Sequence, residues 1–201
     1  KLLHMTADWQ PTQHIDSTGL IMLPSLVAVS RGHGQLDEGQ YDHSPRVFGS
    51  QGAAPLYRRE MLDDTAFEGQ YFDERFFMWY EDVDMDWRAF LRGWECRFAP
   101  DALAYHLGHP DADRQTSLHV KTTVRNRWLM LLTNLAWVEA QSNLSAVVKH
   151  EFSLMKYVVR AGFVGAYFTA LREVMTSRAY VARKRKWVRQ RALRGLCVTN
   201  Q

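Results

Sequence analysis

The stretch "FFMWYEDVDMDWRAFLRGW", residues 76–94, carries four acids within six positions and frames them with aromatic side chains. Counted from Val83, the apolar positions recur after four, seven, eight and eleven residues, which is the spacing of one face of an α-helix. That face comprises Val83, Trp87, Phe90, Leu91 and Trp94. Gly93 and the β-prone "CRFAP" after it indicate the helix end and a following strand. The sequence therefore predicts a helix that starts near residue 81, with the acids in its first turns.

The acids could belong to a calcium loop, because Asp82, Asp84 and Asp86 match the opening D-x-D-x-D of such a loop. The loop also needs a glycine at its sixth position and a glutamate at its twelfth. Trp87 and Gly93 stand there. The calcium interpretation therefore fails.

The acids could instead be helix caps, because negative charge in a first turn meets unpaired N–H groups and the positive end of the helix dipole. Asp84 and Asp86 are then expected on the helix surface, and Asp84 is spaced to pair with Arg88 four residues later. A third interpretation makes one of the acids a general base. Helix capping and catalysis are compatible at the same position.

Shorter elements are predicted before and after this helix. Residues 15–30 read as strands and turns, and residues 31–46 as a long polar loop. Residues 47–62 read as a strand that leads into a short helix, with the small residues 52–54 between them. Small residues indicate either close approach of a ligand to the backbone or tight packing against a helix. A short strand is expected to end near His106.

Charge divides the chain in two. Residues 1–120 hold 10 Lys/Arg against 19 Asp/Glu, whereas residues 121–201 hold 15 against 3. Two long helical patterns cover residues 121–140 and 145–177, and charges interrupt each before the roughly 20 apolar residues that a membrane span needs. Such a split predicts an acidic part that does chemistry and a basic part that meets an anionic surface.

The basic segment 172–194 carries nine Lys/Arg with Tyr180 and Trp187 among them. Cations with interfacial aromatics fit an anionic membrane surface first, a solvated helix face second and nucleic acid third. The two cysteines are far apart, which fits a reducing compartment without a disulfide framework. The first residues contain neither a secretory signal nor an initiating Met, so we expect a piece of a longer protein.

Three segments in order, "GAAPLYRREML" from 52, "YFDERFFMWYEDVDMDWRAFLRGWECRFAPDALAYH" from 71 and "VRNRWLML" from 124, resemble the C-terminal half of bacterial family 2 glycosyltransferases. The resemblance covers about residues 15–135 and is closest to rhamnosyltransferase-like members that decorate cell-surface polysaccharides. It implies an α/β fold. Residues 1–118 would be the acceptor-side half of a GT-A (Rossmann-like) catalytic domain. Residues 119–201 would form a helical, basic, membrane-associating region.

The resemblance implies inverting transfer of a sugar, rhamnose at the family level, from a nucleotide-sugar to a polysaccharide or lipid-linked acceptor. Asp82 matches the family's catalytic base, and Glu81 would orient the site or contact the acceptor. Gly52, Ala53 and Ala54 would lie beside the sugar and the acceptor. Arg88 would bind an acid or an anionic ligand.

The leaving nucleoside diphosphate implies a divalent cation, Mn²⁺ or Mg²⁺. His106 matches a family metal ligand on the strand after the catalytic helix, whereas His109 has no such support. Residues 107–118 would be a flap over the donor. Asp73 and Glu74 would fix the turn before the catalytic helix, with Phe72 buried.

The family's nucleotide-binding half and its D-x-D motif would precede residue 1, so the chain alone is expected to bind nucleotide-sugar poorly and to be inactive. The whole enzyme is expected in the cytoplasm, peripheral at the inner face of the plasma membrane. The alternative is a non-catalytic acceptor- or membrane-binding module whose acids are only helix caps.

Overall fold

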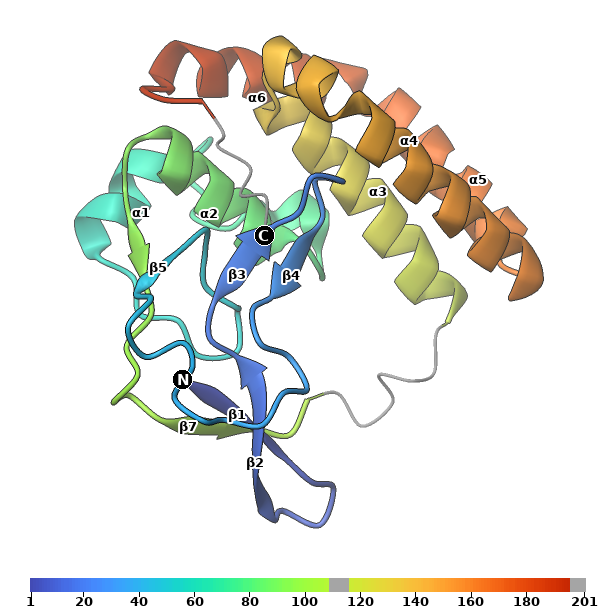
Figure 1. Ribbon diagram of the computed structural model, residues 1–201. Helices are drawn as coiled ribbons and strands as arrows, with labels where there is room; N and C mark the ends of the chain where they lie inside the picture. The colour runs from blue at the N-terminus through green and yellow to red at the C-terminus, as the bar shows by residue number, and fades with distance from the viewer. Residues whose placement is uncertain (109–115, 196–201) are drawn as a thin grey trace.

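The chain folds as a mixed α/β structure, seen in a computed structural model that describes residues 1–108 and 116–195 (Figure 1). The strands of the described residues form three small sheets. In the largest, β1 (Leu2–Met5) pairs with β2 (Pro11–Ser17) antiparallel and with β7 (Ala104–His106) parallel. The strands predicted within 15–30 and the strand that ends at His106 are confirmed.

The two other sheets are antiparallel pairs. β3 (Leu20–Met22) pairs with β4 (Ala28–Ser30), and β5 (Arg46–Val47) pairs with β6 (Cys96–Arg97). Because β5 pairs with β6, the loop after β5 lies beside the segment that follows the acidic helix. Two segments far apart in the sequence thus lie together.

The acidic helix α2 runs from Glu81 to Leu91, as predicted, and Gly93 follows it with a φ of 90°. The other described helices are α1 (Arg59–Thr65), the 3-10 turn η1 (Glu74–Phe76), α3 (Ser117–Asn134), α4 (Trp137–Arg160), α5 (Val164–Thr176) and α6 (Arg178–Arg191). Figure 1 shows α1 on one side of α2 and the helices α3 to α6 gathered on the other.

The helical pattern beyond residue 119 is confirmed, but its division into two helices was wrong. The first predicted helix ends at Asn134 and the next begins at Trp137. The second breaks at Gly162, whose φ of 78° is left-handed and ends α4 before α5 begins. None of the helices in the described part of the chain is long and apolar enough to cross a membrane.

Helix α2 is buried on two opposite faces. Val83, Trp87 and Leu91 face one hydrophobic cluster, whereas Met85 and Ala89 face another that includes Met61 of α1. The helix therefore has little surface. The expectation that Asp84 and Asp86 lie on its surface was wrong, because both are buried.

The larger cluster also joins the two predicted regions of the chain. Besides Trp87, it contains Leu20 from β3, Met130 from α3, and Tyr180 and Val188 from α6. The acidic half and the basic half thus share one hydrophobic core. The prediction that Phe72 is buried was wrong: it is 40% exposed, and Phe76 fills the core instead.

Candidate functional site

The turn that leads into α2 has an unusual backbone. Phe77, Trp79 and Tyr80 have φ values of 62°, 68° and 70°, and none is glycine. Each such residue costs about 1–3 kcal/mol and persists only where its surroundings hold it in place. Strain of this kind concentrates at functional sites. The acids that follow the turn are therefore held in a defined direction.

Helix α3 supplies the groups that hold the turn. The buried Asn126 places its side-chain nitrogen 2.7 Å from the carbonyl oxygens of Phe76 and Met78 and 2.8 Å from that of Trp79. Arg125 donates to the carbonyls of Arg75 and Phe76 at 3.0 and 3.1 Å. Both residues belong to the "VRNRW" run at 124–128.

Asp82 lies at the start of α2 and binds two backbone N–H groups. Its Oδ1 accepts a hydrogen bond from Val83 N at 2.7 Å, and its Oδ2 accepts one from Gly52 N at 3.0 Å. Burial raises the pKa of Asp82 above its usual value, although these two hydrogen bonds act in the opposite direction. A carboxylate with a raised pKa is a better match for proton abstraction near neutral pH.

Glu81 lies beside Asp82 and is half-buried. Burial, with the nearby Asp82 charge as a lesser cause, raises the pKa of Glu81. Among the described residues its Oε2 has no hydrogen-bond partner, and the same holds for Oε1 of Gln51. Within the described residues these two oxygens are therefore buried acceptors without a hydrogen-bond donor.

The small residues Gly52, Ala53 and Ala54 form an exposed turn. The expected packing against a helix is seen at Gly52, which lies against the start of α2: a Cβ added there would lie 3.1 Å from Asp82 Oδ2. The small side chain lets the Gly52 N–H reach the carboxylate, so the turn and the start of α2 form one unit.

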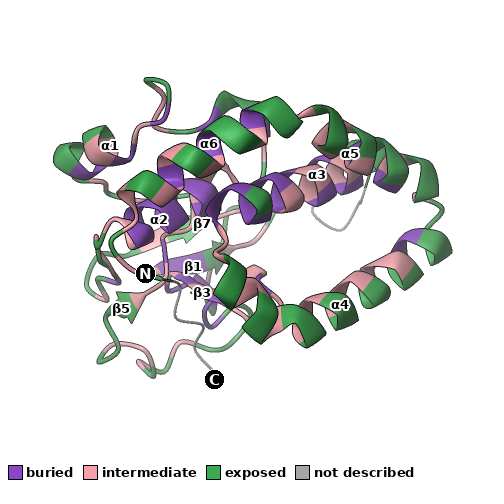
Figure 2. Ribbon diagram, turned by 90° about the horizontal axis from the view of Figure 1, so that it is seen from above, coloured by how far each residue is buried: buried purple, intermediate pink, exposed green. Residues whose placement is uncertain are grey.

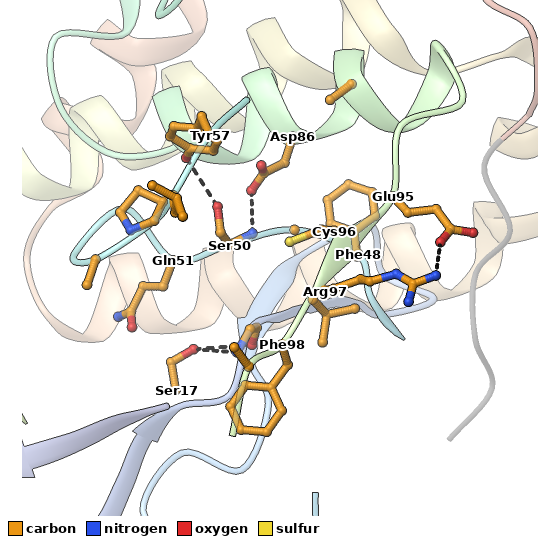
Figure 3. Close-up of a pocket in the computed structure, with 18 of the residues that line it drawn as sticks. Ser17, Phe48, Ser50, Gln51, Tyr57, Asp86, Glu95, Cys96, Arg97 and Phe98 are labelled. Carbon is orange, nitrogen blue, oxygen red and sulfur yellow. Dashed lines mark hydrogen bonds and ion pairs between the residues drawn. The ribbon is translucent and has the colours of Figure 1, made fainter. Parts of the chain in front are cut away.

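A pocket of about 440 Å³ opens on the other part of this turn, between α2 and the β5–β6 pair (Figure 3). Ser50, Gln51 and Ala54 line it together with Tyr57 and Asp86, whereas Asp82 and Glu81 are not on its wall. Sugar-sized ligands suit a concave site of this size with a few convergent polar groups.

Asp86 is the acid of this pocket. Its Oδ2 accepts a hydrogen bond from Ser50 N at 2.7 Å, and Ser50 Oγ binds the Tyr57 hydroxyl at 3.1 Å. Gly49 makes the approach possible, because a Cβ there would lie 2.3 Å from Asp86 Oδ2. Burial raises the pKa of Asp86 well above its usual value, and the neighbouring Asp82 charge adds to the shift.

Cys96 also lines the pocket, but it is not a nucleophile. Burial, with the nearby Asp86 charge as a lesser cause, raises the pKa of its thiol to about 12. The thiolate, which is the reactive form, is therefore nearly absent at neutral pH. The chemistry of this region belongs to its carboxyl and hydroxyl groups.

Asp84 and Arg88 form the predicted ion pair, at 3.0 Å, but in the core rather than on the surface. Arg88 also donates to the carbonyls of Thr65 and Tyr71. The Arg88 side chain is 1% exposed, and its guanidinium is fully engaged. Of the two partners expected from the sequence, an acid or an anionic ligand, Arg88 has the acid. In this conformation no anionic ligand reaches it, which corrects the expected substrate contact.

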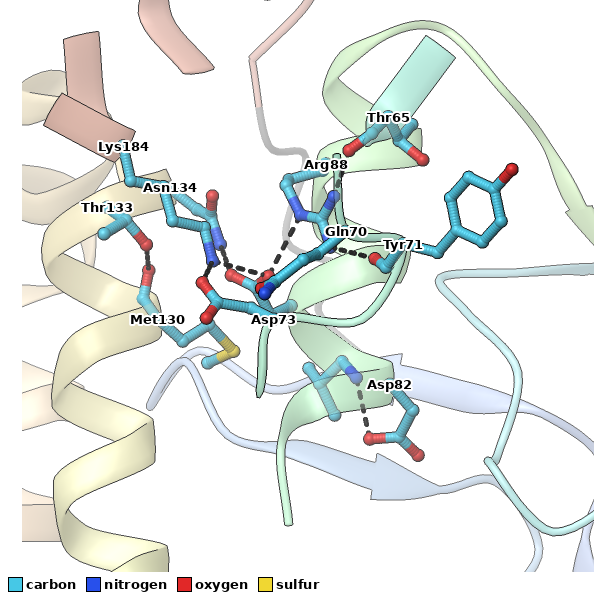
Figure 4. A network of polar contacts seen from close by, with 12 residues as sticks. Thr65, Gln70, Tyr71, Asp73, Asp82, Arg88, Met130, Thr133, Asn134 and Lys184 are labelled. Carbon is cyan, nitrogen blue, oxygen red and sulfur yellow. Dashed lines mark hydrogen bonds and ion pairs between the residues drawn. The ribbon is translucent and has the colours of Figure 1, made fainter. Parts of the chain in front are cut away.

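The charge of Asp84 is compensated from the C-terminal helix. Lys184 of α6 places its Nζ 2.8 Å from Asp84 Oδ2 and 2.7 Å from Asp73 Oδ2 (Figure 4). Burial opposes ionisation, but Lys184 and Arg88 together hold the pKa of Asp84 below its usual value. Asp73 also accepts from Arg75 N, which confirms that it fixes the turn before α2.

His106 ends β7 with its Nδ1 2.9 Å from Oδ2 of the buried Asp16 on β2. The described residues contain no group of three or more His, Cys, Asp or Glu side chains that could hold a metal. A Mg²⁺ or Mn²⁺ ion that keeps water and phosphate ligands needs only one or two protein ligands. The imidazole–carboxylate pair fits that smaller requirement.

Several residues of this region were not found from the sequence. Asp16, Asp86 and Lys184 contact residues that are far away in the sequence. No local sequence pattern indicates these contacts. Asn126 had a signal in the sequence, because "VRNRW" belongs to the segments that carry the family resemblance. Nothing in that run showed what the Asn126 side chain binds. His109 and most of the predicted flap at 107–118 lie outside the described residues.

Comparison with known proteins does not identify a family for this chain. No family model matches the chain, and neither the curated proteins nor the solved structures give a match. The function therefore has to be argued from the residues themselves.

Proposed function

We propose that this chain forms the acceptor side of an inverting glycosyltransferase of GT-A fold, with Asp82 as the general base. The observation that carries the proposal is the Asp82 carboxylate at the tip of α2, bound by Gly52 N–H beside an exposed turn of small residues. The order of the motifs supports it as well. Asp82, Gly52–Ala54 and His106 each match a position of the resembled series.

In the proposed reaction, a hydroxyl oxygen of the acceptor attacks the anomeric carbon of the nucleotide-sugar. The new C–O bond forms as the bond to the diphosphate oxygen breaks on the opposite face, so the configuration inverts. The hydroxyl proton passes to Asp82, and the nucleoside diphosphate leaves with the bonding electrons. The raised pKa of Asp82 serves this step.

Neighbouring residues would position the acceptor. Glu81 and Gln51 each carry a buried oxygen without a hydrogen-bond donor among the described residues, and a side-chain rotation would turn these oxygens toward sugar hydroxyls. Gly52–Ala54 leave room for the ring. Asp16 and His106 would hold a divalent cation, which neutralises charge on a leaving diphosphate. A polysaccharide or lipid-linked glycan is the expected acceptor.

The test replaces Asp82 with asparagine in the natural full-length polypeptide and measures nucleoside diphosphate release with a panel of nucleotide-sugars and glycan acceptors. We expect a loss of about 10²–10⁴-fold in turnover, the usual contribution of a general base. Asp63→Asn is the matched control, because Asp63 is an exposed acid paired with Arg59 on α1. Its activity should stay unchanged.

The pH dependence gives a second readout. Since the base must be deprotonated, turnover should fall as the pH drops through the raised pKa of Asp82, above the range of an ordinary aspartate. Full activity in folded Asp82→Asn protein would refute the base assignment. Glycan binding without any diphosphate release, in wild type and variant alike, would favour the non-catalytic module.

A further inference from the structure

Helix α4 is weakly attached to the rest of the protein. Of its 24 residues only Val158 is buried, in a cluster with Val120 and Val124 of α3 and Tyr167 of α5. An ion pair between Arg127 of α3 and Glu151 adds a polar contact. Figure 2 shows the helix along one side of the molecule, mostly exposed. One long face of α4 is therefore left uncovered within the described structure.

The uncovered face is apolar. Its members recur at intervals of four and seven residues, and the side chain of each is more than half exposed. We call these five residues the α4 face. They are Trp137 (72% exposed), Leu144 (59%), Val148 (57%), Phe152 (63%) and Val159 (57%). Helices of globular proteins normally turn such a stripe toward the core. A contiguous exposed apolar patch marks an interaction site.

The exposed charges beside the α4 face are positive. Lys149, Lys156 and Arg160 are exposed and share the same intervals of seven and four, which places them in a row along one edge of the face. Lys156 Nζ lies 4.5 Å from the ring centre of Phe152. Both acids of α4 are engaged, Glu139 with the Ala136 N–H and Glu151 with Arg127.

We propose that the α4 face docks on an anionic lipid bilayer, with its apolar side chains at the hydrocarbon boundary and its cations among the headgroups. Amphipathic helices with aromatic and aliphatic residues on one face and Lys or Arg beside them lie in the membrane interface. This inference goes beyond the proposed transfer reaction and does not depend on it.

Charge favours an anionic bilayer over a second copy of the chain and over nucleic acid. A second copy packed face to face and antiparallel would bring the rows Lys149–Lys156–Arg160 of both copies together, and like charges repel. Nucleic acid would satisfy the cations but would offer Val148 and Phe152 only polar surface. A bilayer with anionic headgroups supplies both hydrocarbon and negative charge.

The basic helix α6 is less suited to this role than its composition indicated. Lys184 is fully buried, and Arg191 pairs with Asp64. Arg185 and Arg189 donate to backbone carbonyls of α3. Most of its cations thus contact other parts of the protein. Deleting residues 178–201 would also remove core residues, so point substitutions are the sharper test.

The experiment measures co-sedimentation of the 201-residue chain with vesicles of phosphatidylcholine alone and of phosphatidylcholine with 30% phosphatidylglycerol. Wild type should partition onto the anionic vesicles only. Val148→Asp/Phe152→Asp should reduce partitioning at least tenfold. Trp9→Asp/Leu103→Asp is the matched control, with the same charge change at two exposed apolar residues far from α4. It should bind like wild type.

A second pair of double variants distinguishes the cations of α4 from those of α6. Lys149→Gln/Lys156→Gln should lower partitioning about tenfold or more, because each cation at an anionic surface contributes about 1 kcal/mol. Arg183→Gln/Lys186→Gln makes the same charge change at exposed positions of α6 and should have little effect. Circular dichroism melting verifies that every variant is folded.

Three results would overturn the proposal. One is that wild type does not bind anionic vesicles. Another is that binding depends on α6 and not on α4. The third is that light scattering finds a dimer that Val148→Asp/Phe152→Asp separates, with no vesicle binding, which would assign the face to a second copy.

Discussion

Asp82 and Asp86 are one helical turn apart, yet they meet different surroundings. Asp82 faces the exposed turn at Gly52, whereas Asp86 faces a pocket wall at Ser50. Burial raises the pKa of both carboxyl groups, and that of Asp86 well above its usual value. Neither is compensated by a nearby cation in the way that Asp84 is. The two acids are therefore available for proton chemistry and hydrogen bonding rather than for ion pairing.

The raised pKa of Asp86 predicts how stability depends on pH. Because the folded state favours the protonated form, the contribution of this group is fully present below the unfolded pKa, about 3.9, and is lost as the pH rises through the folded pKa. We expect Asp86→Asn to increase the free energy of unfolding at neutral pH. The gain should shrink toward acid pH by at most about 1.4 kcal/mol per pH unit.

Urea unfolding at a series of pH values checks this expectation. Asp63→Asn serves as control, since hydrogen bonds from Tyr71 and Arg59 lower the pKa of that exposed acid and its replacement should not stabilise the protein. A stability difference for Asp86→Asn that is constant with pH, or largest in acid, would contradict the assignment.

At the scale of elements, the start of α2 depends on α3. The strained residues Phe77, Trp79 and Tyr80 precede Glu81 directly, and the carbonyls around them converge on Asn126. This contact joins segments about 50 residues apart in the sequence. The direction of Glu81 and Asp82 is thus set by a helix other than their own.

We expect Asn126→Ala to destabilise the protein by about 2–3 kcal/mol, because buried carbonyls lose their hydrogen-bond donor. Amide hydrogen exchange at residues 77–80 should accelerate more than exchange in α3. Asn143→Ala on α4 is the control: its side chain bonds only to Glu139 O of the same helix, and its loss should cost less than about 0.5 kcal/mol. Equal effects of the two substitutions would argue against a positioning role for Asn126.

At the scale of the whole molecule, the opposite charges of the two halves meet inside the protein. Lys184 binds Asp73 and Asp84, and Arg191 binds Asp64. The charge asymmetry of the sequence therefore serves packing of α6 against α2, in addition to any role toward an external surface. Tyr180, next to Lys184, contributes a hydrogen bond to Asp73.

Lys184 is the most sensitive test of this arrangement. Lys184→Met keeps much of the side-chain volume but removes the cation that the buried Asp73 and Asp84 share, although Asp84 keeps Arg88. We expect a loss of about 3–5 kcal/mol in unfolding free energy. Lys186→Met, two residues away and exposed, should change it by less than about 0.5 kcal/mol. Thermal melting of both variants at neutral pH would compare them, and a similar melting temperature would show that the network is dispensable.

The local patterns of the sequence determined a good part of this fold. Helical spacing placed α2 and its apolar face, Gly93 marked its end, and the Asp84–Arg88 pair followed from spacing alone, because these features depend on neighbours within one or two turns. The helix-rich second half was also predictable. Its breaks near Asn134 and Gly162 were not, since the apolar pattern continues across them.

What only the tertiary structure decided concerns partners far apart in the chain. The sequence could not place Asp84 and Asp86 in the interior, because helical periodicity cannot reveal that α1 covers the second face of α2. It could not show that Lys184 neutralises the acids, or that Gly49 and Gly52 admit the carboxylates to the backbone. Charge and composition are local properties, whereas burial and pairing depend on which segments the fold brings together.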